Sequence, residues 1–499
     1  MGDKPWQALP RHRTSIVTGV MSFTNKSIRL VVSISAVCLL LLHILSSPVL
    51  GQHSGRSLVP SVKQTLLVTT HPSYYNITTH QHRHDRHHRE HHQHSRRRHH
   101  RATLKSVESQ ILFYQTANKS INFTHIEYDI VTGSVYLGAV NWIYQLNGND
   151  LQVERAVRTG PIHESPFCSP ADCAGVAESH LVIPTNNFNK VLLVDPYARM
   201  LIVCGSVHQG ACSRHRLEDI SIHEDLVPIP VASNDENSST VAFIGPARYS
   251  SVQLTPILYV GATNSRIGPY RDTIPAISGR YLESGSRLFN IIDSSFADSA
   301  RVDISSNLRD YFLVRYVYGF YADEYVYFAQ VQRRSDSRAL EESGHVSRLS
   351  RVCVSDPGFR TYTELTLECV HDSSGMSPNV GRSHHHSHHH RQQTGYVEEF
   401  NLLQDAVLIK AGPDLADALG IERNGPVLLG VFAASIDHTQ RVGSRSAVCI
   451  FPLTTIEHLF AENIHRCYNG SVSSRNMGYI AGSVPECPEP GVSKYKTHN

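Results

Sequence analysis

Short strand-like segments follow one another along most of this chain of 499 residues. From about residue 107, apolar or alternating runs are separated by turn-forming residues, as at 134–146, 190–205, 239–262 and 315–329. Nearly four hundred residues of such strands exceed what a single sandwich or barrel holds. A β-propeller accommodates them because its blades repeat around an axis and leave only short exposed edges. We therefore predict an all-β propeller, and no fixed-period sequence repeat indicates a WD-type or kelch array.

One segment near the C-terminal end has helical signals. Thr454 and Glu457 have the spacing of a capping box, in which each side chain bonds a free backbone N–H of the first turn. We predict an amphipathic helix that begins there. Its apolar face is expected to contain Ile456, Leu459, Phe460 and Ile464.

The formal net charge of +2 hides a division of the chain. Residues 1–101 carry fourteen Lys and Arg against three Asp and Glu, which leaves 32 basic and 41 acidic residues in 102–499. An acidic body repels the phosphate backbone of nucleic acids. We therefore expect no nucleic-acid partner.

Residues 1–51 have the pattern of a signal peptide. An apolar run at 30–45 follows basic residues and is shorter than the roughly 20 residues of a membrane span. Val49 and Gly51 suit a cleavage after Gly51, whereas the long basic region and Pro48 leave an uncleaved signal anchor as the alternative. Both interpretations place the body of the chain in the secretory pathway.

Residues 52–106 are polar and lack periodicity, so we predict a disordered segment. Ten His and seven Arg lie within 80–101, which ends in an Arg-x-x-Arg pattern that resembles a proprotein convertase site. We favour a solvated low-complexity tract; charging at endosomal pH and binding of Zn²⁺ or Cu²⁺ are the alternatives. A second His block, at 384–390, is interpreted as an inserted surface loop.

The cysteines and glycosylation motifs agree with an oxidising compartment. Outside the leader there are nine cysteines, without Cys-x-x-Cys or zinc-finger spacing, so disulfides are expected. The pairs Cys168–Cys173 and Cys204–Cys212 are close enough for local bridges, and an odd count leaves one cysteine without a partner in this chain. Five Asn-x-Ser/Thr motifs are glycosylation candidates: Asn76, Asn118, Asn122, Asn237 and Asn469.

The common catalytic signatures are missing from the sequence. There is no P-loop, no dinucleotide-binding glycine motif and no nucleophile elbow, and His163-Glu164 and His223-Glu224 lack the second His of a zincin helix. We predict that the chain is not an enzyme and that it has no catalytic residues, no cofactor and no metal site.

Several motifs in order along the chain resemble the N-terminal sema domain of plexins. They are GSVYLGAVNWIYQL at 133–146 with RTGP at 158–161, NKVLLVD at 189–195, CGSVHQGAC at 204–212, STVAFIG at 239–245, IPAISGR at 274–280, RLSRVCVSDP at 348–357 and AVCIF at 447–451. The resemblance covers about 107–490. Semaphorins share the fold but usually have Gly-Ala-Arg or Gly-Ala-Lys at the position of Gly138 to Asn141, which favours a receptor.

The resemblance implies a seven-bladed propeller over 107–499 that is incomplete at its C-terminal end. A missing final blade and the missing modules beyond it predict an open or strained ring. The implied disulfides are Cys168–Cys173, Cys204–Cys212, Cys369–Cys449 and Cys467–Cys487. Cys353 would pair with a cysteine beyond the end of this chain and is expected to be unpaired.

The resemblance also implies a function: a semaphorin receptor that acts at the cell surface in semaphorin–plexin signalling and axon guidance. The partner would be a semaphorin, with homodimer or co-receptor contacts, and membrane attachment would come only from the missing C-terminal part. Arg266, Tyr270 and Arg271, in a Gly- and Pro-containing loop, are candidate partner-binding residues. The alternatives are a secreted semaphorin-binding decoy, a semaphorin, or a receptor tyrosine kinase of the hepatocyte-growth-factor type.

Overall fold

The computed structural model describes residues 66–69, 111–114, 121–248, 254–295, 298–372, 397–484 and 486–488. The predicted signal peptide, both histidine tracts and the motifs at Asn76 and Asn118 lie outside the described residues. No helix among the described residues is long and apolar enough to cross a membrane.

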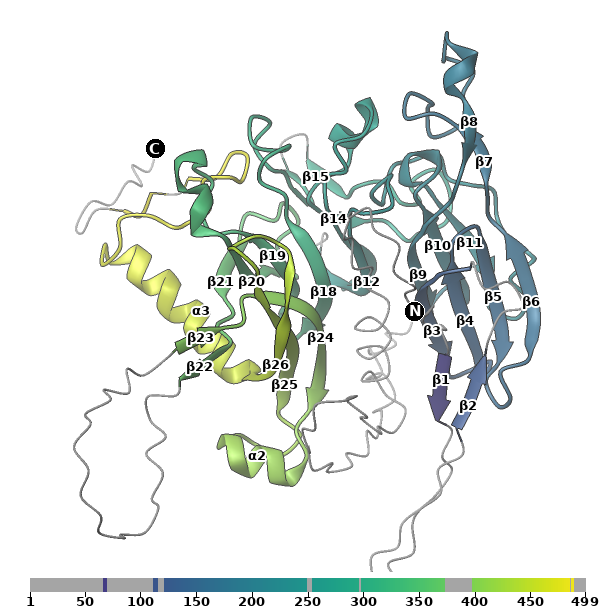
Figure 1. Cartoon of the computed structure of the whole chain (residues 1–499). Coiled ribbons are helices and arrows are strands. Elements are labelled where there is room, and N and C mark those ends of the chain that lie inside the picture. The colour runs from purple at the N-terminus through teal and green to yellow at the C-terminus, as the bar shows by residue number, and fades with distance from the viewer. Residues whose placement is uncertain are drawn as a thin grey trace, which may run out of the picture.

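Five antiparallel sheets of three or four strands follow one another in chain order (Figure 1). We call them blades 1 to 5. Blade 1 contains β3 (Phe123–Asp129), β4 (Ser134–Ala139), β5 (Trp142–Asn147) and β6 (Val153–Arg158). Blade 2 contains β9 (Asn189–Asp195), β10 (Met200–Gly205) and β11 (Cys212–Arg216). Blade 3 contains β12 (Thr240–Ala247), β13 (Thr255–Ala262), β14 (Ile277–Arg280) and β17 (Arg301–Val302). Blade 4 contains β18 (Arg315–Ala322), β19 (Tyr325–Arg333), β20 (His345–Cys353) and β21 (Thr363–Thr366), and blade 5 contains β24 (Leu402–Lys410), β25 (Pro426–Ser435) and β26 (Val442–Pro452).

The remaining elements are short pairs of strands and helical segments. The two-stranded pairs are β1 (Leu66–Thr69) with β2 (Ile111–Tyr114), β7 (Ile162–Glu164) with β8 (Ile183–Thr185), β15 (Asp293–Ser295) with β16 (Asp298–Ser299), and β22 (Val370–Asp372) with β23 (Val397–Glu399). The helical segments are η1 (Ser179–Leu181), η2 (His208–Gly210), η3 (Pro269–Thr273), η4 (Arg338–Ser343), α2 (Pro413–Leu419) and α3 (Leu453–Tyr468).

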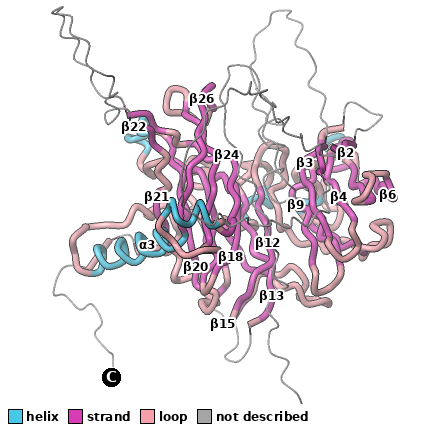
Figure 2. The backbone as a smooth tube through the Cα atoms, turned by 90° about the horizontal axis from the view of Figure 1, so that it is seen from below, coloured by secondary structure: helices cyan, strands magenta, loops and turns pink. Residues whose placement is uncertain are grey.

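The first strands of successive blades lie side by side. β3 contacts β9, β9 contacts β12, β12 contacts β18 and β18 contacts β24. Figure 2 shows these strands following one another across the molecule. This radial order is that of a propeller, so the predicted all-β propeller is confirmed; the described residues form five of its blades.

The apolar core lies between neighbouring blades. Leu192 of blade 2 packs with Tyr136 of blade 1. Leu258 of blade 3 packs with Ile202 of blade 2. Farther along, the aromatic ring of Phe243 lies 5.4 Å from that of Phe328, which joins blades 3 and 4. Each blade therefore covers the face of the next, which explains the continuous apolar runs within the inner strands.

The predicted C-terminal helix is present as α3, but its capping box is wrong. The N-cap position is Pro452, without a side-chain cap. Glu457 instead accepts hydrogen bonds from Tyr327 and Arg351 of blade 4, because the helix packs with this carboxylate toward the blade. Ile456 and Phe460 are buried as predicted, whereas Leu459 and Ile464 are 40% and 48% exposed.

Candidate protein-binding face

Loops of successive blades meet at one end of the propeller. In an antiparallel blade, the connection between its second and third strands and the crossover to the next blade leave from the same end. Four segments meet there: 165–173 of the β7–β8 hairpin, 207–210 between β10 and β11, 233–234 before β12, and 264–273 between β13 and β14. We call these segments the loop face. The β7–β8 hairpin projects at the top of Figure 1.

A left-handed turn of the backbone places the central side chain of the loop face. His208, Gln209 and Gly210 have φ angles of 52°, 56° and 82° in succession. A Cβ atom at Gly210 would lie 1.8 Å from the carbonyl oxygen of Ala232, so only glycine fits there. The close approach holds the turn against the segment before β12 and directs Gln209 inward, where it is 2% exposed.

The Gln209 amide joins three of the four segments. Its Nε2 donates to the carbonyl oxygen of Cys168 at 3.0 Å, and its Oε1 accepts from Asn234 Nδ2 at 2.7 Å. Asn234 Nδ2 also lies 3.3 Å from the carbonyl oxygen of Ile267, and Ser265 Oγ donates to Asn234 Oδ1. Buried polar groups that are all hydrogen-bonded make a network rigid, so these loops form one fixed surface.

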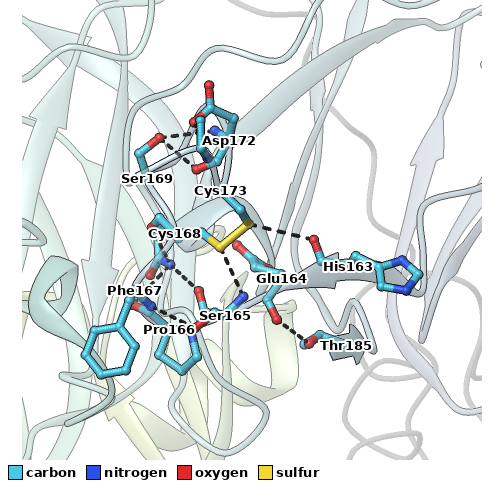
Figure 3. Close-up of a disulfide and its surroundings, with 12 residues drawn as sticks. His163, Glu164, Ser165, Pro166, Phe167, Cys168, Ser169, Asp172, Cys173 and Thr185 are labelled. Carbon is cyan, nitrogen blue, oxygen red and sulfur yellow. Dashed lines mark hydrogen bonds between the residues drawn. A yellow bond between two sulfur atoms is a disulfide. The ribbon is translucent and has the colours of Figure 1, made fainter. Parts of the chain in front are cut away.

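The loop that contains the Cys168–Cys173 disulfide is held by its own hydrogen bonds and by contact with segment 264–273. Figure 3 shows Cys168 bonded to Cys173, with the backbone N–H of Ser165 directed at the Cys168 sulfur at 3.2 Å. A Cβ atom at Gly268, whose φ is +67°, would lie 2.3 Å from the carbonyl oxygen of Pro166, so this glycine lets segment 264–273 approach the loop. The ring of Phe167 points away from the disulfide and is 58% exposed.

Segment 264–273 is held by two crossed ion pairs. Arg271 lies 3.3 Å from Asp310, and Arg309 lies 3.0 Å from Asp272. Arg271 also donates to the carbonyl oxygen of Arg266 at 2.9 Å. The guanidinium of Arg271 is therefore occupied within the protein, and it positions the loop that carries the exposed Arg266.

A buried carboxyl group lies beneath the loop face. Glu164 is 7% exposed, and its Oε1 has no hydrogen-bond partner among the described residues. Burial raises the pKa of Glu164 to about 7, although the backbone N–H groups of His208 and Gln209 lower it in part. Burial also lowers the pKa of His208, which a hydrogen bond to the backbone of Pro170 offsets in part. Burial therefore favours the neutral form of both groups, and Arg266 carries the exposed positive charge of segment 264–273.

The three candidate partner-binding residues differ in their exposure to solvent. Arg266 is exposed, with a φ of 61°, whereas Tyr270 and Arg271 are half-buried. Phe167 and Ile267, which are 58% and 38% exposed, were not among the residues predicted from the sequence. Nothing in an isolated Phe or Ile marks it as exposed. Gln209 and Gly210 did stand out, as part of the family-specific CGSVHQGAC motif, but without a role.

The four implied disulfides are present in the structure, with S–S distances between 2.00 and 2.08 Å. Cys353 is a free, half-buried cysteine. Asn122, Asn237 and Asn469 are exposed, and their glycosylation stays a prediction. The described residues contain no group of three or more His, Cys, Asp or Glu placed to hold a metal ion.

Comparison with known proteins identifies the fold. Residues 403–496 match the family model described as Sema domain. Two structures of the plexin A4 full extracellular region, of domains 1 to 8 and of domains 1 to 10, are each 27% identical with a TM-score of 0.58. The similarity covers 74% of this chain and 38% or 30% of the plexin chains, so the chain spans less than two fifths of their length.

The fold and the comparisons together define a β-propeller of the sema type. The chain contains a sema domain similar to that of the plexin extracellular region.

Proposed function

We propose that this chain provides the semaphorin-binding sema domain of a plexin-type receptor. The observation that carries the proposal is the 27% identity to the plexin A4 extracellular region over 74% of the chain. The CGSVHQGAC motif supports it, because its Gln209 and Gly210 build the centre of the loop face. The domain would act outside the cell in semaphorin signalling and axon guidance, with homodimer or co-receptor contacts and with membrane attachment supplied by a further part of the receptor.

We further propose that the loop face contacts the semaphorin. Phe167 and Ile267 are exposed apolar side chains on loops that Gly268 brings together, and Arg266 adds an exposed cation beside them. Aromatic and Arg side chains dominate the energy of protein interfaces. Because hydrogen bonds and ion pairs already fix these loops, little loop ordering would oppose binding.

Binding measurements test the proposal. The full chain, secreted from cultured cells, is passed over immobilised semaphorin ectodomains and the affinity is measured by surface plasmon resonance. We expect binding to at least one semaphorin, and a loss of about tenfold or more in affinity for Phe167→Ala and for Arg266→Glu, which corresponds to roughly 1.4 kcal/mol each. Arg271 is not the residue to change first, because its ion pair with Asp310 supports the loop.

The matched control is Tyr128→Ala. Tyr128 is 54% exposed and lies near the end of β3, at the opposite end of blade 1 from the loop face. Its change should leave affinity intact. Absence of binding to any semaphorin would contradict the receptor function, whereas wild-type affinity in both loop-face variants would contradict only the assignment of the surface.

A further inference from the structure

A second site lies far along the chain from the loop face, at the outer edge of blade 4. A cavity of about 220 Å³ lies between β21, the second half of α3 and the segment 472–477. Its wall includes Cys467, which the disulfide to Cys487 ties to the C-terminal segment. The cavity is therefore enclosed by elements whose relative positions are held covalently and by packing.

The cavity wall is strongly basic. Arg348, Arg466 and Arg475 line it, against one acidic residue, Glu364. The carboxylate of Glu364 is fully buried and lies 3.1 Å from Arg348 Nη1. It also accepts hydrogen bonds from Tyr362 Oη at 2.6 Å, Gln332 Nε2 at 3.2 Å and Tyr479. These donors occupy the carboxylate, and Arg466 and Arg475 form no ion pair with it or with any other described residue.

Two guanidinium nitrogens in the wall are buried without a partner. Arg348 is 9% exposed, and its Nε makes no hydrogen bond within the described part of the chain. The Nε of Arg475 is likewise buried and without a partner, although its Nη2 donates to the carbonyl oxygen of Val484 at 2.6 Å. A buried N–H without an acceptor is costly, and it costs more when it carries positive charge. Both side chains line the cavity, so an anion bound there would offer acceptors to them.

We propose that this cavity binds a small oxyanion, a sulfate or a phosphate group. Guanidinium groups bind tetrahedral oxyanions through several charge-assisted hydrogen bonds. Three arginines from β20, the end of α3 and the following segment converge on one cavity, and Asn463 and Ser474 add polar side chains to its wall. The bound group would be either the free ion or an ester of it. The site does not depend on the proposed semaphorin binding.

Titration of the purified full chain with sodium sulfate tests the site. Isothermal titration calorimetry is run against sodium chloride at the same ionic strength, and sodium phosphate and N-acetylglucosamine 6-sulfate are the other probes. We expect saturable binding of at least one oxyanion, weakened about tenfold or more in Arg466→Gln and in Arg475→Gln, because each loses one charge from the cavity. Binding of the inorganic ions alone would assign a free anion, whereas tighter binding of the sugar sulfate would assign an ester.

Two controls keep the test decisive. Arg423→Gln removes an arginine that is 69% exposed and lies outside the cavity, so it should bind like the wild type. Arg466 is exposed and supports no ion pair among the described residues, so its change should leave the fold intact, as circular dichroism would verify. Absence of saturable binding, or equal affinity in the wild type and both cavity variants, would overturn the proposal.

Discussion

The loop face and the α3 side of the propeller are stabilised in different ways. The loop face uses short disulfides, which join cysteines 5 and 8 residues apart, and neutral hydrogen bonds from the side chains of Gln209 and Asn234. Its ion pairs, such as that of Arg271 with Asp310, are partly exposed. On the α3 side, the disulfide Cys369–Cys449 joins cysteines 80 residues apart. There Arg351 lies between the rings of Tyr325 and Phe460, at 4.1 and 4.3 Å, and pairs with Glu457. The interactions of the loop face fix the conformation of loops, whereas those of the α3 side join helices and strands that are distant in the sequence.

The largest expected effect comes from the long-range disulfide. Replacing Cys369 and Cys449 by Ala frees a loop of 80 residues in the unfolded chain, which costs about 4.5 kcal/mol on the chain-entropy estimate. The matched change of Cys204 and Cys212, 8 residues apart, costs about 2.5 kcal/mol on the same basis. Urea unfolding without reductant measures both. Equal losses in the two variants would contradict the distinction between the regions.

The next effect comes from the ion pair that docks α3. Glu457→Ala leaves the guanidinium of Arg351, whose side chain is 7% exposed, without its carboxylate, and also removes the acceptor of Tyr327. We expect a loss of about 3 kcal/mol in the free energy of unfolding. Glu462→Ala, on the exposed side of the same helix, should change stability by less than about 0.5 kcal/mol. Similar stabilities for the two variants would show that the pair does not hold the helix.

A smaller effect is expected at the centre of the loop face. Gln209→Ala removes the acceptor of Asn234 and the donor to Cys168 but keeps the same backbone. Because buried polar groups are left without partners, we expect a loss of about 2 kcal/mol in the free energy of unfolding. We also expect faster hydrogen exchange confined to 165–173 and 264–273. Gln152→Ala, at an exposed position, is the control. Unchanged exchange in both segments would mean that the amide does not join them.

The smallest effect is a dependence of stability on pH through Glu164. Its folded pKa of about 7 lies above the ordinary value of 4.5, so the folded state binds this proton more tightly than the unfolded state. The stability that this proton contributes is complete below about pH 4.5 and is lost as the pH rises to about 7. Between pH 5 and pH 8, the free energy of unfolding of Glu164→Gln should therefore rise relative to that of the wild type by on the order of 1–2 kcal/mol. Unfolding curves of both proteins across this range should converge at the acid end; parallel curves would refute the assignment.

The architecture and the local disulfides were accessible from the sequence because their signals are local. Alternation of side chains along a strand and turn residues such as Asp195, whose carboxylate accepts from the backbone of Tyr197 and Ala198, need no distant partner. The loop face was only partly predicted. Its Gly-containing loop and Arg266 stood out, but the exposure of Phe167 and the internal use of Arg271 depend on neighbouring segments. The predicted Thr454–Glu457 capping box was wrong because Glu457 accepts hydrogen bonds from Tyr327 and Arg351, which lie far from it in the sequence.

Local sequence patterns specify the all-β class and the order of the strands, and family resemblance gives the pairing of the cysteines. Tertiary structure decided which polar groups meet. Glu457 pairs with Arg351, 106 residues away, and Gln209 bonds to Cys168, 41 residues away. The three arginines of the anion cavity likewise come from separate elements. The physical reason is that strand formation depends on periodicity between near neighbours, whereas a binding surface depends on hydrogen-bond and charge partners that only the packing of blades brings within reach.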